Sequence, residues 1–137
     1  MYPEDLIHPM RQELVDAGLK EVRSSDEVVE SIDSQGSTFV VINSVCGCAA
    51  ANARPAVRMA LKNSGKLPDR MITSFAGNDV EAVNKAREMM APFPPSSPSM
   101  ALFKDGELVH MIERHHIEGR DAQLIAENLE NAFAEHC

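Results

Sequence analysis

Apolar side chains recur at the spacing of an amphipathic helix in five segments of the chain. These segments cover residues 4–17, 24–35, 49–61, 79–90 and 121–135. Pro9 should kink or interrupt the first helix and Pro55 should bend the third, because proline lacks the N–H that a helix interior needs. The last helix is expected to turn four large apolar side chains inward, namely Leu124, Ile125, Leu129 and Phe133.

Short runs of β-branched and apolar residues between these segments predict strands. Residues 38–42 (TFVVI) form a nearly continuous run, which is typical of a central strand buried on both faces. Residues 71–75 predict a second strand. Residues 99–103 and 107–112 flank Lys104-Asp105-Gly106, and an Asp-Gly pair between two strand-like runs favours a β-hairpin.

The order of these elements predicts an α/β fold. Two helices come first, followed by strand, helix, strand, helix, strand, hairpin strand and helix. The first strand–helix–strand portion should form a right-handed parallel crossover, and the hairpin should add an antiparallel edge. We therefore expect one domain over residues 1–137, with a mixed sheet of about four strands flanked by helices and an N-terminal helical extension. This layout resembles a thioredoxin-like domain, although the periodicity by itself leaves other α/β sandwiches open.

Size and charge narrow the class of protein. A chain of 137 residues can bury a core and fold as one domain. Lys and Arg total 13 and Asp and Glu total 21, so the formal net charge of -8 argues against a broad nucleic-acid-binding face. No apolar run approaches the roughly 20 residues of a membrane helix. The N-terminal segment lacks the basic and apolar regions of a secretory signal, which favours the cytoplasm.

Three cysteines carry the candidate chemistry, and their odd number excludes a closed disulfide framework. Cys46 and Cys48 lie where the central strand ends and a helix begins, and Cys137 is the last residue. Unpaired N–H groups and the helix dipole stabilise a thiolate at such a position, so Cys46 should be the more acidic and more exposed of the pair. Since the thiolate attacks disulfides, the CGC turn predicts thiol–disulfide exchange. We expect Gly47 to adopt a backbone conformation that other residues avoid and to leave the Cys46 sulfur uncovered.

A second segment resembles part of thioredoxin. In residues 98–107 (PSMALFKDGE), a proline is followed by an apolar strand, a Lys, a turn Gly and a Glu. The resemblance implies a cis Ser97–Pro98 peptide bond beside the cysteines, where its backbone would meet an extended partner. Spacing alone would not predict this bond, because only about 5–6% of bonds before proline are cis.

The resemblance to one family is closer and extends over nearly the whole chain. The sequence is similar to the bacilliredoxins, which are CGC-type thioredoxin-like proteins of bacteria. The matching stretches are NSVCGCAA at 43–50, ARPA at 53–56, FAG at 75–77, PPSSPSMA at 94–101, Arg114-His115, IEG at 117–119 and His136-Cys137. They follow the same order as in the family, with similar gaps.

This resemblance implies a thiol–disulfide oxidoreductase that removes a low-molecular-weight thiol of the bacillithiol type from mixed disulfides on client proteins. It implies Cys46 as the attacking thiol, the small thiol as a co-substrate, no bound cofactor, and a weak disulfide isomerase activity. The adduct on Cys46 must then be released by Cys48, by a free small thiol or by Cys137. We expect the free small thiol, because Cys48 must strain a one-residue turn to reach Cys46.

Other functions stay open on the residues alone, and nothing in the sequence predicts an oligomeric state. A Cys46–Cys48 disulfide would close a small, strained ring, which favours an oxidant or a disulfide isomerase. The two cysteines and a histidine could instead form a metal-binding module. The candidate histidines are His110, His115, His116 and His136. Their spacing fits no compact zinc motif, so we expect no metal. A third alternative is an adaptor whose cysteines no longer react.

Overall fold

The structure is a computed structural model that describes residues 1–137, and its centre is a mixed sheet with the strand order β1-β3-β2-β4-β5. The strands are β1 (Lys20–Glu21), β2 (Ser37–Asn43), β3 (Arg70–Phe75), β4 (Ser99–Lys104) and β5 (Glu107–Ile112). β2 is parallel to β3 and antiparallel to β4, and all of its residues are buried. The predicted central strand, buried on both faces, is confirmed.

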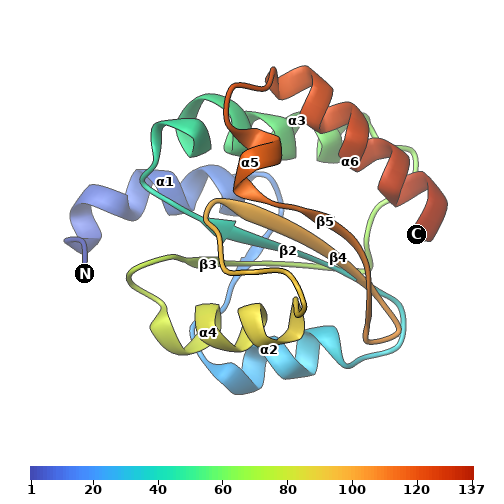
Figure 1. The fold of residues 1–137 in the computed structure, drawn as a ribbon, viewed down its shortest axis with the longest axis horizontal. Helices are drawn as coiled ribbons and strands as arrows, with labels where there is room; N and C mark the ends of the chain where they lie inside the picture. Colours follow the sequence, from blue (N-terminus) through green and yellow to red (C-terminus); the bar gives the residue numbers. More distant parts are fainter.

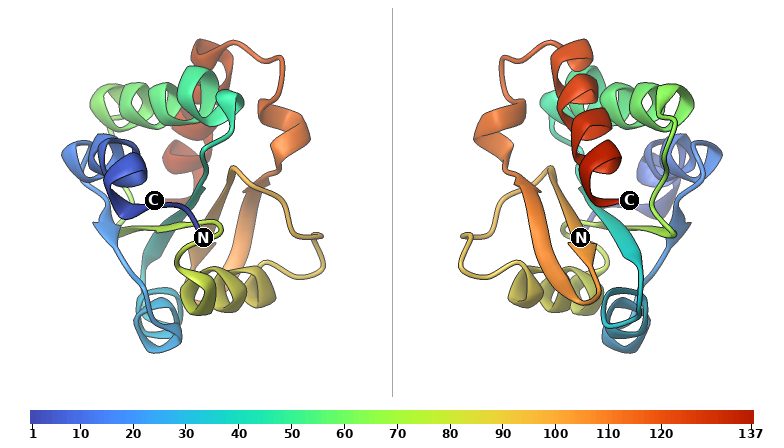
Figure 2. Two further views of the ribbon diagram at one scale, coloured as in Figure 1. Left: turned by 90° about the vertical axis from the view of Figure 1, so that its left-hand side faces the viewer. Right: turned by 90° about the vertical axis from the view of Figure 1, so that its right-hand side faces the viewer.

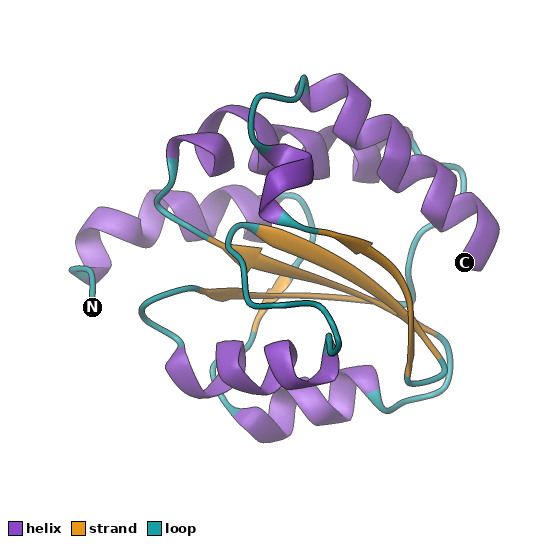
Figure 3. Cartoon of the chain, viewed as in Figure 1, coloured by secondary structure: helices purple, strands orange, loops and turns teal.

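Two layers of helices cover the sheet (Figure 3). The helices are α1 (Glu4–Asp16), α2 (Ser25–Ile32), the π-helical η1 (Ala49–Ala53), α3 (Arg54–Asn63), α4 (Val80–Met89), α5 (Arg114–Ile117) and α6 (Ala122–His136). α2 and α4 lie on one face of the sheet, and α1, α3 and α6 lie on the other (Figures 1 and 2). No helix has both the length and the apolar character to cross a membrane.

Alternate residues of β2 contribute to two separate cores. Phe39 and Val41 pack with α3 and α6, whereas Val40 and Ile42 pack with α2 and α4. On the first side, Phe39 meets Phe133 of α6 edge to face, with ring centroids 5.1 Å apart. Because both faces of β2 are enclosed by close packing, the end of this strand is held firmly against the helices around it.

The predicted hairpin is also confirmed, since β4 pairs antiparallel with β5 at the edge of the sheet. Asp105 and Gly106 join the two strands with φ angles of 51° and 83°. Two successive positive φ angles are typical of a type I′ turn, whose twist matches that of the flanking strands.

Some details of the fold were not predicted, and one was predicted wrongly. The sheet has a fifth strand, β1, which pairs in parallel with β3 and is too short to leave a pattern in the sequence. The single turn of α5 was not predicted for the same reason. Leu124 was expected on the inner face of α6, but it is 59% exposed. The other three expected side chains, Ile125, Leu129 and Phe133, are buried.

The prolines inside helices have different effects. α1 continues through Pro9, so the expected break does not occur there. Pro55 directly follows the start of α3, and the preceding η1 is wide enough for the Arg54 N–H to donate to the Ala49 carbonyl five residues earlier. A wide turn accommodates the proline ring, which clashes with the carbonyl four residues before it in a regular α-helix. The disturbance expected at Pro55 is therefore a π-helical turn.

Candidate active site

Cys46 and Cys48 lie at the junction between β2 and the helix that begins at Gly47, as the sequence predicts. The chain leaves the sheet after Asn43 and turns through Ser44, whose hydroxyl accepts a hydrogen bond from the Cys46 N–H at 3.1 Å. Both cysteines are half-buried free thiols, and their sulfur atoms are 2.7 Å apart. The turn thus holds the two sulfurs in hydrogen-bonding contact at the beginning of a helix.

The surroundings of the two thiols shift their pKa values in opposite directions. A hydrogen bond from the Cys48 thiol is the main cause that lowers the pKa of Cys46; the N–H groups of Cys48 and Ala49 and the charge of Arg114 also lower it. Burial raises the pKa of Cys48 to about 11, and the hydrogen bond to Cys46 and the negative charge there add to the effect. Cys46 is therefore the more acidic thiol of the pair, and Cys48 donates the hydrogen bond that stabilises its thiolate form.

Arg114 is a site residue to which the sequence alone gave no definite role. One guanidinium nitrogen of Arg114 donates to the Cys46 sulfur at 3.2 Å, and the other donates to the Ser97 carbonyl at 3.3 Å. Its third partner is Glu118, on the same turn of helix. The only signal in the sequence was its place in the stretch that resembles the bacilliredoxins, because α5 is too short to be predicted.

The segment before β4 lies beside the CGC turn. The Ser97–Pro98 bond is cis, as expected, and a second cis bond at Ala91–Pro92 was not anticipated. Pro98 is buried, whereas Ser97 is half-buried and its carbonyl contacts the same guanidinium as the Cys46 sulfur. The structure therefore places Ser97 close to Cys46, the candidate nucleophile.

Gly47 differs from the expectation in one respect. Its φ angle is not positive, so the turn requires no backbone conformation that an L-residue would avoid. A Cβ atom built on Gly47 would meet no atom within 4 Å, and the residue is exposed. What glycine contributes at this position is open space next to the cysteines.

A buried arginine, Arg54, holds the backbone of the turn through hydrogen bonds. Arg54, only 3% exposed, donates to the Ser44 carbonyl at 2.9 Å and to the Asn43 side-chain oxygen at 3.1 Å. Its Nε donates to Glu13 of α1 at 2.8 Å. These bonds hold Ser44, whose hydroxyl in turn accepts from the Cys46 N–H. Arg54 thereby connects α1 and α3 with the backbone that positions the nucleophile.

Cys137 does not lie near Cys46 and Cys48. Its N–H donates to Phe133 at the end of α6, and Phe133 packs on Phe39 near the beginning of β2. Cys46 follows the other end of β2, and the C-terminus lies far along the sheet from the start of the CGC helix (Figure 1). The half-buried Cys137 packs against the core on this side. The geometry therefore separates Cys137 from the Cys46 sulfur.

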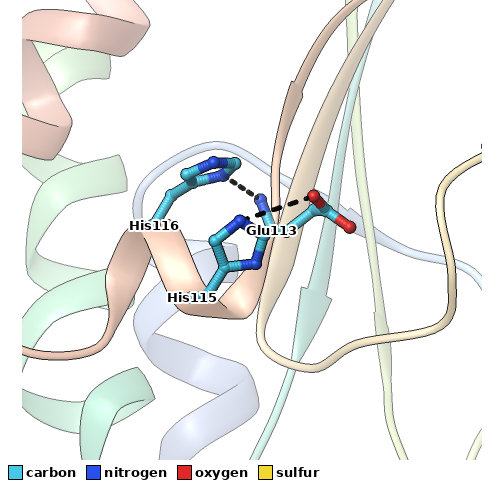
Figure 4. Close-up of side chains that lie close together, drawn as sticks. All are labelled: Glu113, His115 and His116. Carbon is cyan, nitrogen blue, oxygen red and sulfur yellow. Dashed lines mark hydrogen bonds and ion pairs between the residues drawn. The ribbon is translucent and has the colours of Figure 1, made fainter.

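Two of the histidines form a cluster with a carboxylate, in which the potential ligand atoms of Glu113, His115 and His116 all lie within 4.8 Å of one another (Figure 4). No cysteine belongs to this cluster. The Nδ1 atom of His116 accepts a hydrogen bond from the Glu113 N–H at 3.0 Å, so its Nε2 atom carries the proton. His116 thus has no free lone pair for a metal in this arrangement. The geometry gives no support to a metal site built on the cysteines and a histidine.

Comparison with known proteins places this site in a family. Residues 2–137 match the family described as Disulphide isomerase. A bacilliredoxin from Cytophaga hutchinsonii is 55% identical over 135 residues, which cover 98% of this chain and 99% of the relative. A bacilliredoxin from Bacillus licheniformis is 53% identical over 137 residues, which cover 99% of this chain and 95% of the relative.

Solved structures confirm the fold. The oxidised thioredoxin of Plasmodium falciparum superposes with a TM-score of 0.60 at 19% identity, covering 85% of this chain and 99% of the thioredoxin. An oxidoreductase described as having a thioredoxin fold gives a TM-score of 0.63 at 14% identity, covering 85% of this chain and 96% of its own. Together with the full-length matches, these findings show that the chain belongs to the bacilliredoxin family of thiol–disulfide oxidoreductases, which have a thioredoxin-like fold.

Proposed function

We propose that the protein removes a low-molecular-weight thiol of the bacillithiol type from mixed disulfides on client proteins, with Cys46 as the attacking thiolate. The observation that carries the proposal is the environment of the Cys46 sulfur. A thiol, two backbone N–H groups and the guanidinium of Arg114 all favour its charged form. A thiolate held in this way at a half-exposed turn can attack a disulfide that approaches from solvent.

The reaction follows from this arrangement. The Cys46 thiolate attacks the sulfur of the small thiol, a new S–S bond forms, and the bond between the small thiol and the client breaks. The client leaves as a thiolate and takes a proton from water. A second small thiol, as its thiolate, then attacks the adduct, regenerates the Cys46 thiolate and leaves as the symmetrical small-molecule disulfide. The free small thiol is the reductant of the cycle.

The acidity of Cys48 supports release by the small thiol. A thiol with a pKa of about 11 is almost entirely protonated at neutral pH and is a poor nucleophile. When Cys46 carries the adduct, its sulfur is no longer a thiolate, so its charge and the hydrogen bond to the charged sulfur no longer raise the pKa of Cys48. Burial, the largest cause, remains. Cys137 lies at the other end of the sheet and is not proposed to resolve the adduct in the same molecule.

We assign client binding to the exposed side of the CGC turn. Gly47 leaves open space there, and the Ser97 carbonyl, which precedes Pro98, shares the Arg114 guanidinium with the Cys46 sulfur. We expect an extended client segment to pair with the backbone before β4, as an added strand pairs with a sheet edge. We expect the protein to act in the cytoplasm, because the free small thiol that the cycle consumes is kept reduced there.

Mass spectrometry of the Cys48→Ser variant tests the proposal. The variant is incubated with a client that carries the small thiol, and the reaction is stopped with acid. We expect the mass of one small thiol on Cys46, loss of that mass from the client, and continued turnover when free small thiol is added. Cys46→Ser should release nothing. Equal release by Cys46→Ser and the wild type would overturn the proposal.

A second candidate function is disulfide isomerisation, with the Cys46–Cys48 pair as the exchanging group. It is supported by the contact between the two sulfur atoms and by the description of the matched family. The two functions separate in the Cys48→Ser variant. Reactivation of a protein with scrambled disulfides should depend on Cys48 if the pair exchanges as a disulfide, whereas removal of the small thiol should not.

A further inference from the structure

α5 is a single helical turn, and it carries Arg114, the cation beside the Cys46 sulfur. A turn of four residues has too few internal hydrogen bonds to be stable by itself, so contacts with the rest of the chain must hold it. At its C-terminal end Ile117 is fully buried, and the Ile117 carbonyl accepts a hydrogen bond from the Asn52 side chain of η1 at 3.1 Å. The end that carries Arg114 needs a separate support.

The side chain of His116 supplies this support. Its Nδ1 atom accepts a hydrogen bond from the N–H of Glu113, the residue directly before Arg114, at 3.0 Å (Figure 4). Glu113 is only 9% exposed, so water cannot readily replace this acceptor. An acceptor on the third helical residue that binds the N–H of the N-cap residue closes the first turn of a helix, as Glu or Gln does in a capping box. The Arg114 N–H has a longer contact of its own, with Ser96 Oγ at 3.3 Å.

We propose that His116 is a positioning residue for the reaction, because its neutral ring holds the first turn of α5 where the Arg114 guanidinium meets the Cys46 sulfur. The inference rests on the proposed role of Cys46 as the attacking thiolate, since it names what keeps the cation of that thiolate in place. The connection runs through the backbone, in which Glu113 and Arg114 are consecutive residues. His116 therefore acts through Arg114 and not on the reacting atoms.

This support exists only while His116 is neutral. An imidazolium carries a proton on both nitrogens and has no lone pair with which to accept the Glu113 N–H. The titratable and charged groups around the ring are His115 and Glu113 in its own segment, His110 of β5, and Arg120, which follows α5. The side chains of α6 that face the same space do not titrate; they are Leu124, Ile125 and Asn128.

These surroundings favour the neutral ring. Partial burial is the main cause that lowers the pKa of His116, and the positive charges of His115, Arg120 and His110 lower it further, whereas Glu113 opposes them. The ring is therefore neutral at neutral pH, and the support is lost only as the pH falls below the ordinary pKa of histidine, about 6.5.

Two substitutions separate the acceptor from the titration. His116→Gln keeps an acceptor of the kind that capping boxes use, His116→Leu removes it, and neither changes a charge at pH 7.5. In the Cys48→Ser, Cys137→Ser background, we expect His116→Leu to slow alkylation of Cys46 at this pH about two- to fivefold, as loss of the cation would, and His116→Gln to keep the unsubstituted rate. His115→Leu is the matched control, since the His115 ring faces the Glu113 carboxylate at 3.7 Å and not the backbone N–H, and it should also keep that rate.

A double-mutant cycle shows whether His116 acts through Arg114. His116→Leu combined with Arg114→Gln should be no slower than Arg114→Gln alone, because the cation that His116 positions is already gone. Losses that multiply across the two substitutions would mean a direct effect on Cys46 and would overturn the proposal. An unchanged rate in His116→Leu, or an equal loss in His116→Gln, would overturn it as well.

The titration is followed by NMR in the Cys46→Ser variant, which keeps His116 and in which Cys46 no longer titrates. As the pH falls, we expect the Glu113 amide proton signal to move upfield, as loss of its hydrogen bond requires, with the same midpoint as the His116 ring signals. The same step should be missing when His116→Gln is added. A Glu113 amide signal that does not move upfield with the His116 titration would overturn the proposal. Neither this measurement nor the alkylation uses a client, so failure to release a small thiol from clients would overturn the proposed function without changing either result.

Discussion

The guanidinium of Arg114 donates a hydrogen bond to the sulfur of Cys46 at 3.2 Å, from a position 68 residues further along the chain. The contact joins α5 to the CGC turn, and the same guanidinium holds the Ser97 carbonyl. A positive charge next to a thiolate favours the charged form, so this arginine contributes directly to the acidity of the nucleophile.

Arg114→Gln should make Cys46 less reactive at neutral pH. Loss of the cation raises the pKa of Cys46, so a smaller fraction of the sulfur is thiolate below that pKa. Because Arg114 is half-exposed and screened by solvent, we expect alkylation of Cys46 at pH 7 to slow only about two- to fivefold. The measurement is the alkylation rate against pH, in the Cys48→Ser, Cys137→Ser background.

Two controls accompany this prediction. Arg114→Lys keeps the charge and should recover part of the rate, and added salt should reduce the difference between wild type and Arg114→Gln. Identical pH profiles for wild type and Arg114→Gln would mean that the contact does not act on the sulfur.

The acidity of Cys48 should depend on Cys46. The pKa of Cys48 is raised to about 11, first by burial and then by the hydrogen bond and charge of Cys46. In Cys46→Ser the charge is removed, so the pKa of Cys48 should fall below 11 but stay above that of an ordinary thiol. Thiolate absorbance in the ultraviolet, recorded against pH in the Cys137→Ser background, reports this value. A pKa still near 11 would show that the thiolate of Cys46 has no influence.

Arg54 and Arg58 offer a matched pair, because both bind the carboxylate of Glu13. Arg54 is 3% exposed and also holds Asn43 and Ser44, whereas Arg58 is 47% exposed. Arg54→Gln should lower the free energy of unfolding by about 3 kcal/mol, since it leaves buried acceptors unpaired. Arg58→Gln should lower it by less than about 1 kcal/mol. Urea denaturation measures both, and equal losses would contradict the assignment of Arg54 as the support of the turn.

Gly47→Ala should not destabilise the fold, but it should slow the reaction with protein clients. The φ angle of Gly47 is not positive and a Cβ atom has room there. The variant should therefore gain about 0.5 kcal/mol in free energy of unfolding, because alanine reduces the conformational entropy of the unfolded chain. The methyl group would project where we place the client. Removal of the small thiol from a protein client should therefore slow, while alkylation of Cys46 by a small reagent should not. Unchanged rates with protein clients would mean that clients do not bind on the exposed side of Gly47.

Features that short stretches of chain encode can be predicted from local sequence patterns. The continuous apolar run of β2 predicted a central strand, and the Asp-Gly pair predicted the hairpin, because burial on both faces and positive φ angles each demand particular residues. The position of Cys46 at a helix start predicted the direction in which its pKa moves. The resemblance to the bacilliredoxins supplied the cis Ser97–Pro98 bond, which spacing did not predict.

Contacts between distant side chains, in contrast, depend on how the helices and strands pack together. Arg114 and Arg54 are ordinary arginines in the sequence. Only the packing of α5 over the CGC turn brings Arg114 to Cys46, and only the packing of α1 against α3 brings Arg54 to Glu13. Long side chains reach several positions from one backbone site, so no local pattern fixes their partners. The same holds for Cys137, whose separation from Cys46 follows from the direction of α6 across the sheet.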